Sequence, residues 1–147
     1  QHRDKVQSYI ELAKQEGGQI VAGGKVIEKD GAWIEPTVIT GLSHKSRTAT
    51  EEIFGPVVTI HKFNSDQEAI EMANCTQYGL AGSVWSKYRG KEVAEKIDSG
   101  MVWVNTWLHR DLRVPFGGVK DSGVGREGGM WSIGFFSEAI NICVMED

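Results

Sequence analysis

Apolar residues near the start of the chain recur at helical spacing, and those that follow recur at strand spacing. Val6, Ile10 and Ala13 lie four and three positions apart among charged residues, which predicts a helix over residues 2–16. A pair of glycines directly after this segment supplies the left-handed stop that ends many helices. Short runs rich in β-forming residues then predict strands over residues 19–22, 25–28 and 33–39.

Beyond residue 56 the pattern alternates between strands and helices. Ser65 with Glu68 forms a capping box, which predicts the start of a helix that runs to about Asn74. The other expected elements are strands over residues 57–63, 80–85 and 101–104 and a helix over residues 90–99. The order β-α-β-α-β is typical of an α/β fold with a parallel sheet and right-handed crossovers. Because no repeat or linker-like stretch divides the chain, we expect one structural unit.

Ligands of open α/β sheets bind beyond the carboxyl ends of the strands. This rule directs attention to Asn105, which follows the third predicted strand, to the segment 106–129 after it, and to the region of Glu52. The last apolar stretch, residues 135–144, predicts a terminal strand, and such a strand often requires the edge of a partner sheet.

Composition and charge narrow the class of protein. The chain has 147 residues, 40% of them hydrophobic, and a net charge of -4 that is spread evenly, which argues against a nucleic-acid partner. No apolar run approaches the ~20 residues of a membrane span, and the first residues do not form a signal peptide. Cys75 and Cys143 lack the spacing of a zinc site or a disulfide framework, so we expect no metal and a cytoplasmic location. We interpret both as packed thiols.

Several polar and aromatic residues are candidates for chemistry, each with an alternative. Glu52 precedes Phe54 and a Gly-Pro turn, although an acid pair before a strand is often simply solvated. Arg110 and Arg113 offer guanidinium groups that suit a carboxylate ligand, or they pair with Asp111 or neighbouring acids at the surface. The glycine-rich segment 122–129 does not match a phosphate-binding loop, and none of the histidines shows ligand spacing.

Four motifs in order identify a resemblance. They are EEIFGPV at residues 51–57, YGLAGSVWS at 78–86, SGMVWVNTW at 99–107 and PFGGVKDSGVGREGG at 115–129. Together they resemble the C-terminal third of the NAD(P)-dependent aldehyde dehydrogenase superfamily. The resemblance implies that residues 1–136 form the C-terminal part of the catalytic domain and that residues 137–147 form an oligomerisation strand. It also implies that the cysteine nucleophile, the general base and the nucleotide-binding loop lie upstream, so no catalytic residue is expected here.

The same resemblance implies roles for individual residues. Glu52 matches the glutamate that binds the nicotinamide ribose of NAD, and Phe54 matches the aromatic residue at the nicotinamide end. Phe116 matches the ring that lines the aldehyde pocket. Asn105 matches a residue that braces the loop behind the catalytic centre, and we include it among the substrate-site candidates.

The segment NTWLHRDLRVPFGG, residues 105–118, is similar to that of 2-hydroxymuconic and 2-aminomuconic semialdehyde dehydrogenases. Their substrates carry a carboxylate opposite the aldehyde, which implies that Arg110 binds it, with Arg113 as the second candidate. The implied reaction passes through a cysteine thiohemiacetal and a thioester, with hydride transfer to NAD, in a homo-dimer or homo-tetramer. A general aldehyde dehydrogenase and a non-catalytic chain that binds or oligomerises remain alternatives.

Overall fold

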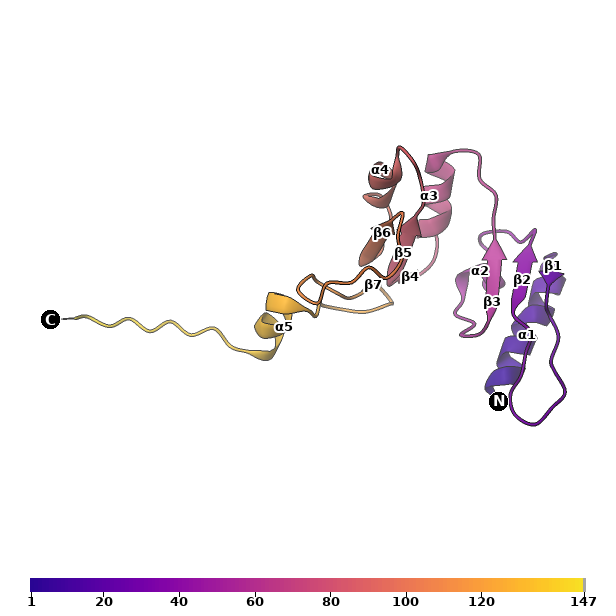
Figure 1. The fold of residues 1–147 in the computed structure, drawn as a ribbon, viewed down its shortest axis with the longest axis horizontal. Helices are drawn as coiled ribbons and strands as arrows, with labels where there is room; N and C mark the ends of the chain where they lie inside the picture. Colours follow the sequence, from indigo (N-terminus) through magenta and orange to yellow (C-terminus); the bar gives the residue numbers. More distant parts are fainter. Residues whose placement is uncertain (147) are drawn as a thin grey trace. The chain divides into compact units, whose positions relative to one another are not determined.

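A computed structural model describes residues 1–146, and Figure 1 shows the order of their helices and strands. The elements are α1 (His2–Gln15), β1 (Gln19–Ala22), β2 (Thr37–Thr40), α2 (Arg47–Thr50), β3 (Val57–Ile60), α3 (Asp66–Asn74), β4 (Tyr78–Gly79), β5 (Ala81–Val84), α4 (Gly90–Ala94), β6 (Met101–Val104), β7 (Val119–Lys120) and α5 (Gly129–Phe136). Their contacts divide the chain after Thr76 into two units, where the sequence indicated one. No proline-rich or serine-rich linker marks this boundary.

In the first unit, α1 packs against a three-stranded sheet (Figure 1). The apolar stripe predicted from spacing is the buried face of the helix, because Val6, Ile10 and Ala13 are all buried. Val6 and Ile10 contact Ile53, while Ala13 contacts Ile39 of β2. The burial of this stripe, rather than helix propensity alone, therefore holds α1 in place.

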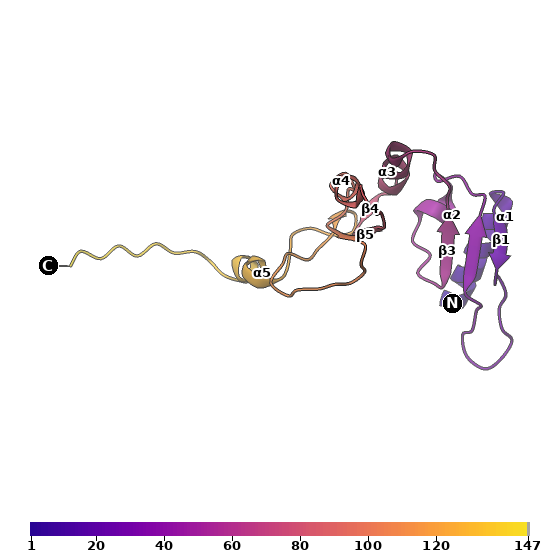
Figure 2. The ribbon, with the colours of Figure 1, turned by 45° about the horizontal axis from the view of Figure 1, so that its top comes forward.

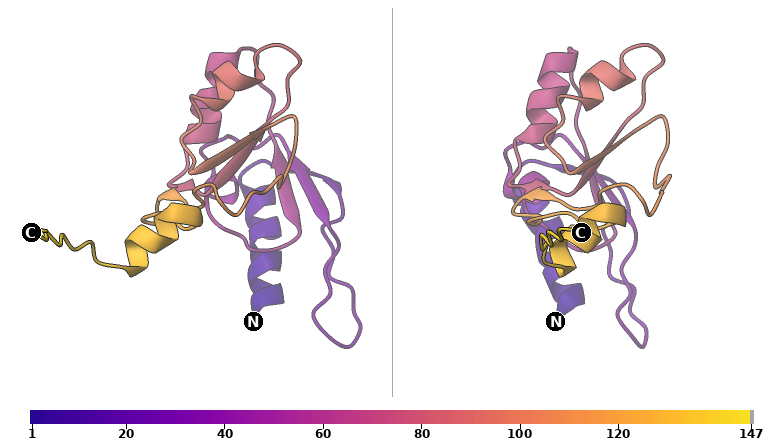
Figure 3. Two further views of the ribbon diagram at one scale, coloured as in Figure 1. Left: turned by 60° about the vertical axis from the view of Figure 1, so that its left-hand side comes forward. Right: turned by 90° about the vertical axis from the view of Figure 1, so that its left-hand side faces the viewer.

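The sheet of the first unit has the order β1-β2-β3, with β1 antiparallel to β2 and β2 parallel to β3. The expected strands over residues 25–28 and 33–39 are wrong in extent, because this region holds only a bridge between Val26 and Ile34, and β2 begins at Thr37. Residues 23–36 instead form a loop that projects from the sheet (Figures 2 and 3). Most side chains of the loop are exposed, Trp33 by 48%, and although Ile34 packs against the core, little apolar burial is available to stabilise longer strands.

The second unit contains a parallel pair of strands covered by a short helix. β5 pairs with β6 in register from Ala81 opposite Met101, and α4 contacts both strands. β4 pairs with β7 in the antiparallel direction. The α/β class and its parallel strands are thus confirmed. One continuous β-α-β-α-β sheet is not, because among residues 1–146 β3 pairs with β2 rather than with β5.

Two further predicted elements differ in extent. The predicted strand over residues 57–63 ends at Ile60, and the helix expected over residues 90–99 ends at Ala94. After Ala94 the chain continues in tighter turns, in which Lys96 N–H donates to Val93 and Ile97 N–H donates to Ala94. By contrast, the helix after Ser65 is confirmed, since the Ser65 side chain accepts from Glu68 N–H at 3.2 Å.

The end of the chain differs most from expectation. Phe135 and Phe136 are the last residues of helix α5, not the start of a strand. This helix was not predicted because it is apolar on all sides and has no amphipathic period. Residues 137–146 form no strand, and Figure 3 shows them extended beyond α5. A strand there needs a second edge to pair with, so the oligomerisation strand stays a prediction, with Asp147 outside the described residues. Among residues 1–146, no helix is both long and apolar enough to cross a bilayer.

Candidate functional site

The segment that carries Glu52 and Phe54 alternates between buried and exposed side chains. Ile53 lies in the core beside Val6 and Ile10, which turns its two neighbours outward. Glu52 is exposed, and within residues 1–146 its carboxylate has no hydrogen-bond or ion-pair partner. Phe54 is 75% exposed and adopts a left-handed backbone with φ of 58°. The two predicted cofactor residues therefore lie on one outward-facing segment of the first unit.

Glu51, directly before this segment, is held rather than free. Arg47 donates to its two carboxylate oxygens at 2.6 and 3.1 Å, and the Tyr9 hydroxyl donates to the second at 2.7 Å. These charge-assisted bonds lower the pKa of Glu51 from 4.5 to about 2, with Arg47 as the main cause. Of the acid pair singled out in the sequence, the first residue is structural and the second faces outward.

Asn105 links the ends of β5 and β6 in the second unit. Its side-chain carbonyl accepts from Ser86 N–H at 2.8 Å, and its amide donates to the Ser86 carbonyl at 2.9 Å. Its backbone is left-handed, with φ of 54°, a conformation that asparagine tolerates better than most residues. Because both side-chain groups bond to Ser86, Asn105 ties the start of the following loop to the end of β5.

The two candidate arginines of this loop have different surroundings. The Arg110 guanidinium carbon lies 4.5 Å from the centre of the Phe116 ring, and its nearest acid is Glu127 at 4.0 Å. Arg113 forms a two-pronged pair with Asp111, with N–O distances of 2.5 to 3.1 Å. This pair lowers the pKa of Asp111 and raises that of Arg113. The structure thus brings Arg110, but not Arg113, together with Phe116.

Phe116 and Glu127 are joined by two backbone hydrogen bonds of 2.8 Å, one in each direction. Both residues line two pockets, one of about 250 Å³ and one of about 370 Å³, so the pair forms a wall shared by both. The smaller pocket also includes Trp103, His109 and Arg110. Trp103 donates to the His109 carbonyl at 2.9 Å, which ties the loop back to β6.

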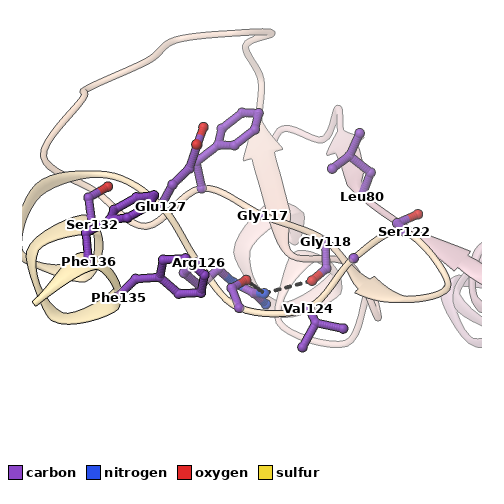
Figure 4. A pocket seen from close by; sticks show the side chains of 13 residues that line it. Leu80, Gly117, Gly118, Ser122, Val124, Arg126, Glu127, Ser132, Phe135 and Phe136 are labelled. Carbon is purple, nitrogen blue, oxygen red and sulfur yellow. Dashed lines mark hydrogen bonds between the residues drawn. The ribbon is translucent and has the colours of Figure 1, made fainter.

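The larger pocket lies between the glycine-rich segment and α5. Figure 4 shows Phe135 and Phe136 on one side and Leu80 on another. Arg126 donates to the carbonyls of Gly118 and Gly125, both at 2.7 Å, so its guanidinium supports the loop (Figure 4).

Close backbone approach explains glycine at two positions around these pockets. A Cβ on Gly100 would lie 1.7 Å from the Gly117 carbonyl oxygen. A Cβ on Gly128, which has φ of 100°, would lie 2.4 Å from the Val114 carbonyl oxygen. Only glycine permits these approaches, which set the path of the chain around Phe116.

Comparison with known proteins places this arrangement in a family. Residues 1–142 match the sequence profile of the aldehyde dehydrogenase family. The chain belongs to that family. It is 54% identical to a 2-aminomuconic 6-semialdehyde dehydrogenase of a Pseudomonas species over 99% of this chain. It is 48% identical to a 2-hydroxymuconic semialdehyde dehydrogenase of Pseudomonas strain CF600 over 98% of this chain, and it spans 31% of the length of each relative.

A solved aldehyde dehydrogenase has the same fold over this region. Betaine aldehyde dehydrogenase from Staphylococcus aureus, in complex with NAD+, matches with a TM-score of 0.87 and 44% identity. The match covers 92% of this chain and 28% of the other. The resemblance inferred from the four motifs is thereby confirmed, together with the α/β class of this aldehyde dehydrogenase segment.

Arg126 and Glu127, which line these pockets, were not predicted as site residues from the sequence of this aldehyde dehydrogenase chain. Both residues stand between glycines, a composition that marks close backbone approach. The spacing does not, however, show which groups the Arg126 and Glu127 side chains contact. Both cysteines, interpreted as packed thiols, are instead free and exposed. Cys75 lies at the open end of α3, and Cys143 lies in the extended terminal segment, where neither has a core to enter.

Proposed function

We propose that this chain is the C-terminal portion of an NAD-dependent aldehyde dehydrogenase that oxidises a semialdehyde bearing a carboxylate. The observation that carries the proposal is the position of Arg110, 4.5 Å from the Phe116 ring at the edge of a pocket. In the proposed enzyme, Phe116 forms an apolar wall beside the aldehyde group of the substrate, and Arg110 binds the carboxylate at the opposite end of the substrate. The cysteine nucleophile and the general base belong to the part of the enzyme that precedes this chain.

The charge environment of Arg110 supports an acidic substrate. Its side chain is 50% exposed, and the 4.0 Å distance to Glu127 is longer than a direct hydrogen bond. The guanidinium therefore retains N–H groups that can donate to a carboxylate in the paired geometry that arginine favours. The relatives at 54% and 48% identity are named muconic semialdehyde dehydrogenases, and these names support the same substrate class.

The residues of the first unit fit a nicotinamide cofactor. One carboxylate can accept from the two adjacent hydroxyls of a ribose, and the unpartnered carboxylate of Glu52 meets that requirement. The exposed ring of Phe54 offers an apolar surface beside it. When bound, NAD supplies the hydride acceptor for the oxidation. In the proposed enzyme, Glu52 and Phe54 hold and orient the nicotinamide end.

The proposal extends to assembly as a cytoplasmic homo-dimer or homo-tetramer. Ile140, Ile142 and Val144 are each more than 70% exposed and alternate with Asn141 and Cys143. A period of two suits a strand with one buried face, and the backbone of residues 137–146 makes no backbone–backbone hydrogen bond within residues 1–146. Addition of this segment to a sheet edge of a second subunit would satisfy both the apolar side chains and the backbone.

The test uses the complete enzyme with NAD, comparing 2-hydroxymuconic semialdehyde with a neutral aldehyde of similar size. We expect a higher kcat/KM for the carboxylated substrate. Glu52→Gln should raise the KM for NAD by about tenfold while the melting temperature stays the same, because a ribose contact is lost and no contact within the chain is. Equal use of both aldehydes would favour a general aldehyde dehydrogenase. A protein without activity on either aldehyde would favour the alternative of a non-catalytic chain that binds or oligomerises.

A further inference from the structure

One stripe of α1 holds the segment that carries Glu52 and Phe54. His2 donates to the Phe54 carbonyl at 2.6 Å, and Lys5 donates to the Glu52 carbonyl at 3.0 Å. Tyr9 donates to Glu51 at 2.7 Å. Positions 2, 5 and 9 are three and four residues apart, so they lie on one face of the helix. The helix and the segment therefore run side by side in opposite directions.

The stripe continues at the C-terminal end of α1. The Glu16 carboxylate accepts from the backbone N–H groups of Arg47 and Thr48 at 2.9 and 3.1 Å, and from the Thr48 hydroxyl at 2.6 Å. It thus satisfies the free N–H groups at the start of α2. With the start of α2 fixed in this way, the Arg47 side chain reaches Glu51 one turn later.

These side-chain contacts matter because the backbone of the segment is not held by regular structure. Within residues 1–146, no backbone–backbone hydrogen bond involves Glu52, Ile53 or Phe54. Phe54 also occupies a left-handed conformation that is unfavourable for an aromatic residue. The direction of the Glu52 side chain is therefore set by the burial of Ile53 and by the contacts from α1 and α2.

We infer that Arg47 and Tyr9 are positioning residues for the cofactor, acting through Glu51. This inference rests on the proposed function, in which Glu52 binds the nicotinamide ribose. Arg47 and Tyr9 both hydrogen-bond the Glu51 carboxylate, and the next residue in the chain is Glu52. Loss of either hydrogen-bond partner allows the peptide between Glu51 and Glu52 to rotate. The Glu52 carboxylate then moves away from the ribose hydroxyls, although no group that touches the cofactor has been removed.

The experiment measures NAD binding to the complete enzyme by calorimetry, along with steady-state kinetics and thermal melting. Tyr9→Phe and Arg47→Gln should each raise the Kd and KM for NAD by about threefold to tenfold, the effect of losing one charge-assisted contact. The KM for the aldehyde and kcat at saturating NAD should change by less than about twofold. Lys14→Gln is the matched control, because Lys14 pairs with Glu11 at 2.8 Å on the same helix and, within residues 1–146, makes no hydrogen bond or ion pair with α2 or Glu51.

Each outcome decides between positioning and mere stabilisation. Unchanged NAD affinity in folded Tyr9→Phe would overturn the inference, as would an equal loss of affinity in Lys14→Gln. Should Arg47→Gln fail to fold, Tyr9→Phe still decides, because it removes only one oxygen. Glu52→Gln separates the two proposals. Unchanged NAD affinity in that variant refutes the cofactor role itself, whereas weaker binding there with normal binding in Tyr9→Phe refutes only the positioning role.

Discussion

Replacement of Arg110 by glutamine tests the substrate assignment most directly. The change removes the charge and the forked donors, and it retains a polar side chain of moderate length. A hydrogen bond to a charged group contributes about 1.5–3 kcal/mol. Because the Arg110 side chain is 50% exposed, solvent screening moves the expected loss toward the lower limit of that range, about 1.5 kcal/mol. This corresponds to about a tenfold fall in kcat/KM.

Glu127 increases the expected effect. Its carboxylate lies 4.0 Å from Arg110, and both residues line the same pocket. Without the guanidinium, this carboxylate is left to repel the carboxylate of the substrate. We therefore expect kcat/KM for 2-hydroxymuconic semialdehyde to fall by about tenfold to thirtyfold. A neutral aldehyde, which makes no contact with the charge, should lose about twofold or less.

The assay follows NADH formation by the complete enzyme with the two aldehydes as substrates. Arg113→Gln provides the comparison, since it makes the same change in net charge three residues away at a side chain that pairs with Asp111. We expect a smaller effect from it on both substrates. The reasoning is refuted when Arg110→Gln reduces activity on both aldehydes equally, or when Arg113→Gln produces the larger selective loss.

Two further predictions concern stability of the complete enzyme. The lowered pKa of Glu51 means that its pair with Arg47 stabilises the fold above its ordinary pKa of 4.5 and loses this effect as the pH falls toward about 2. The difference in unfolding free energy between wild type and Glu51→Gln should therefore shrink over that range, and a constant difference would contradict the pairing. Gly100→Ala should cost about 2–3 kcal/mol in chemical denaturation because its Cβ would meet the Gly117 carbonyl, whereas Gly134→Ala, with no atom within 4 Å, should not destabilise.

Local patterns predicted those elements whose physical causes are local. The stripe of Val6, Ile10 and Ala13 gave α1, and the Ser65 cap gave the start of α3, because side-chain spacing and capping involve residues within one turn of each other. The same locality explains the failures. Helix α5 has no amphipathic period, and the terminal strand needs an edge that its own neighbours in sequence do not provide.

The family could be identified from the sequence alone, because the four motifs and their order are visible there. The outward positions of Glu52 and Phe54 depend instead on the packing of Ile53 against α1, which is distant in sequence. Resemblance placed Arg110 ahead of Arg113, and the contact between Arg110 and Phe116 is a feature of the tertiary structure. Arg110 and Arg113 are chemically alike, and one short-range pair with Asp111 occupies the second. Likewise, the hydrogen bond from Tyr9 to Glu51 joins residues that are 42 positions apart in the sequence. Such contacts depend on the path of the backbone between distant segments, which local spacing does not specify.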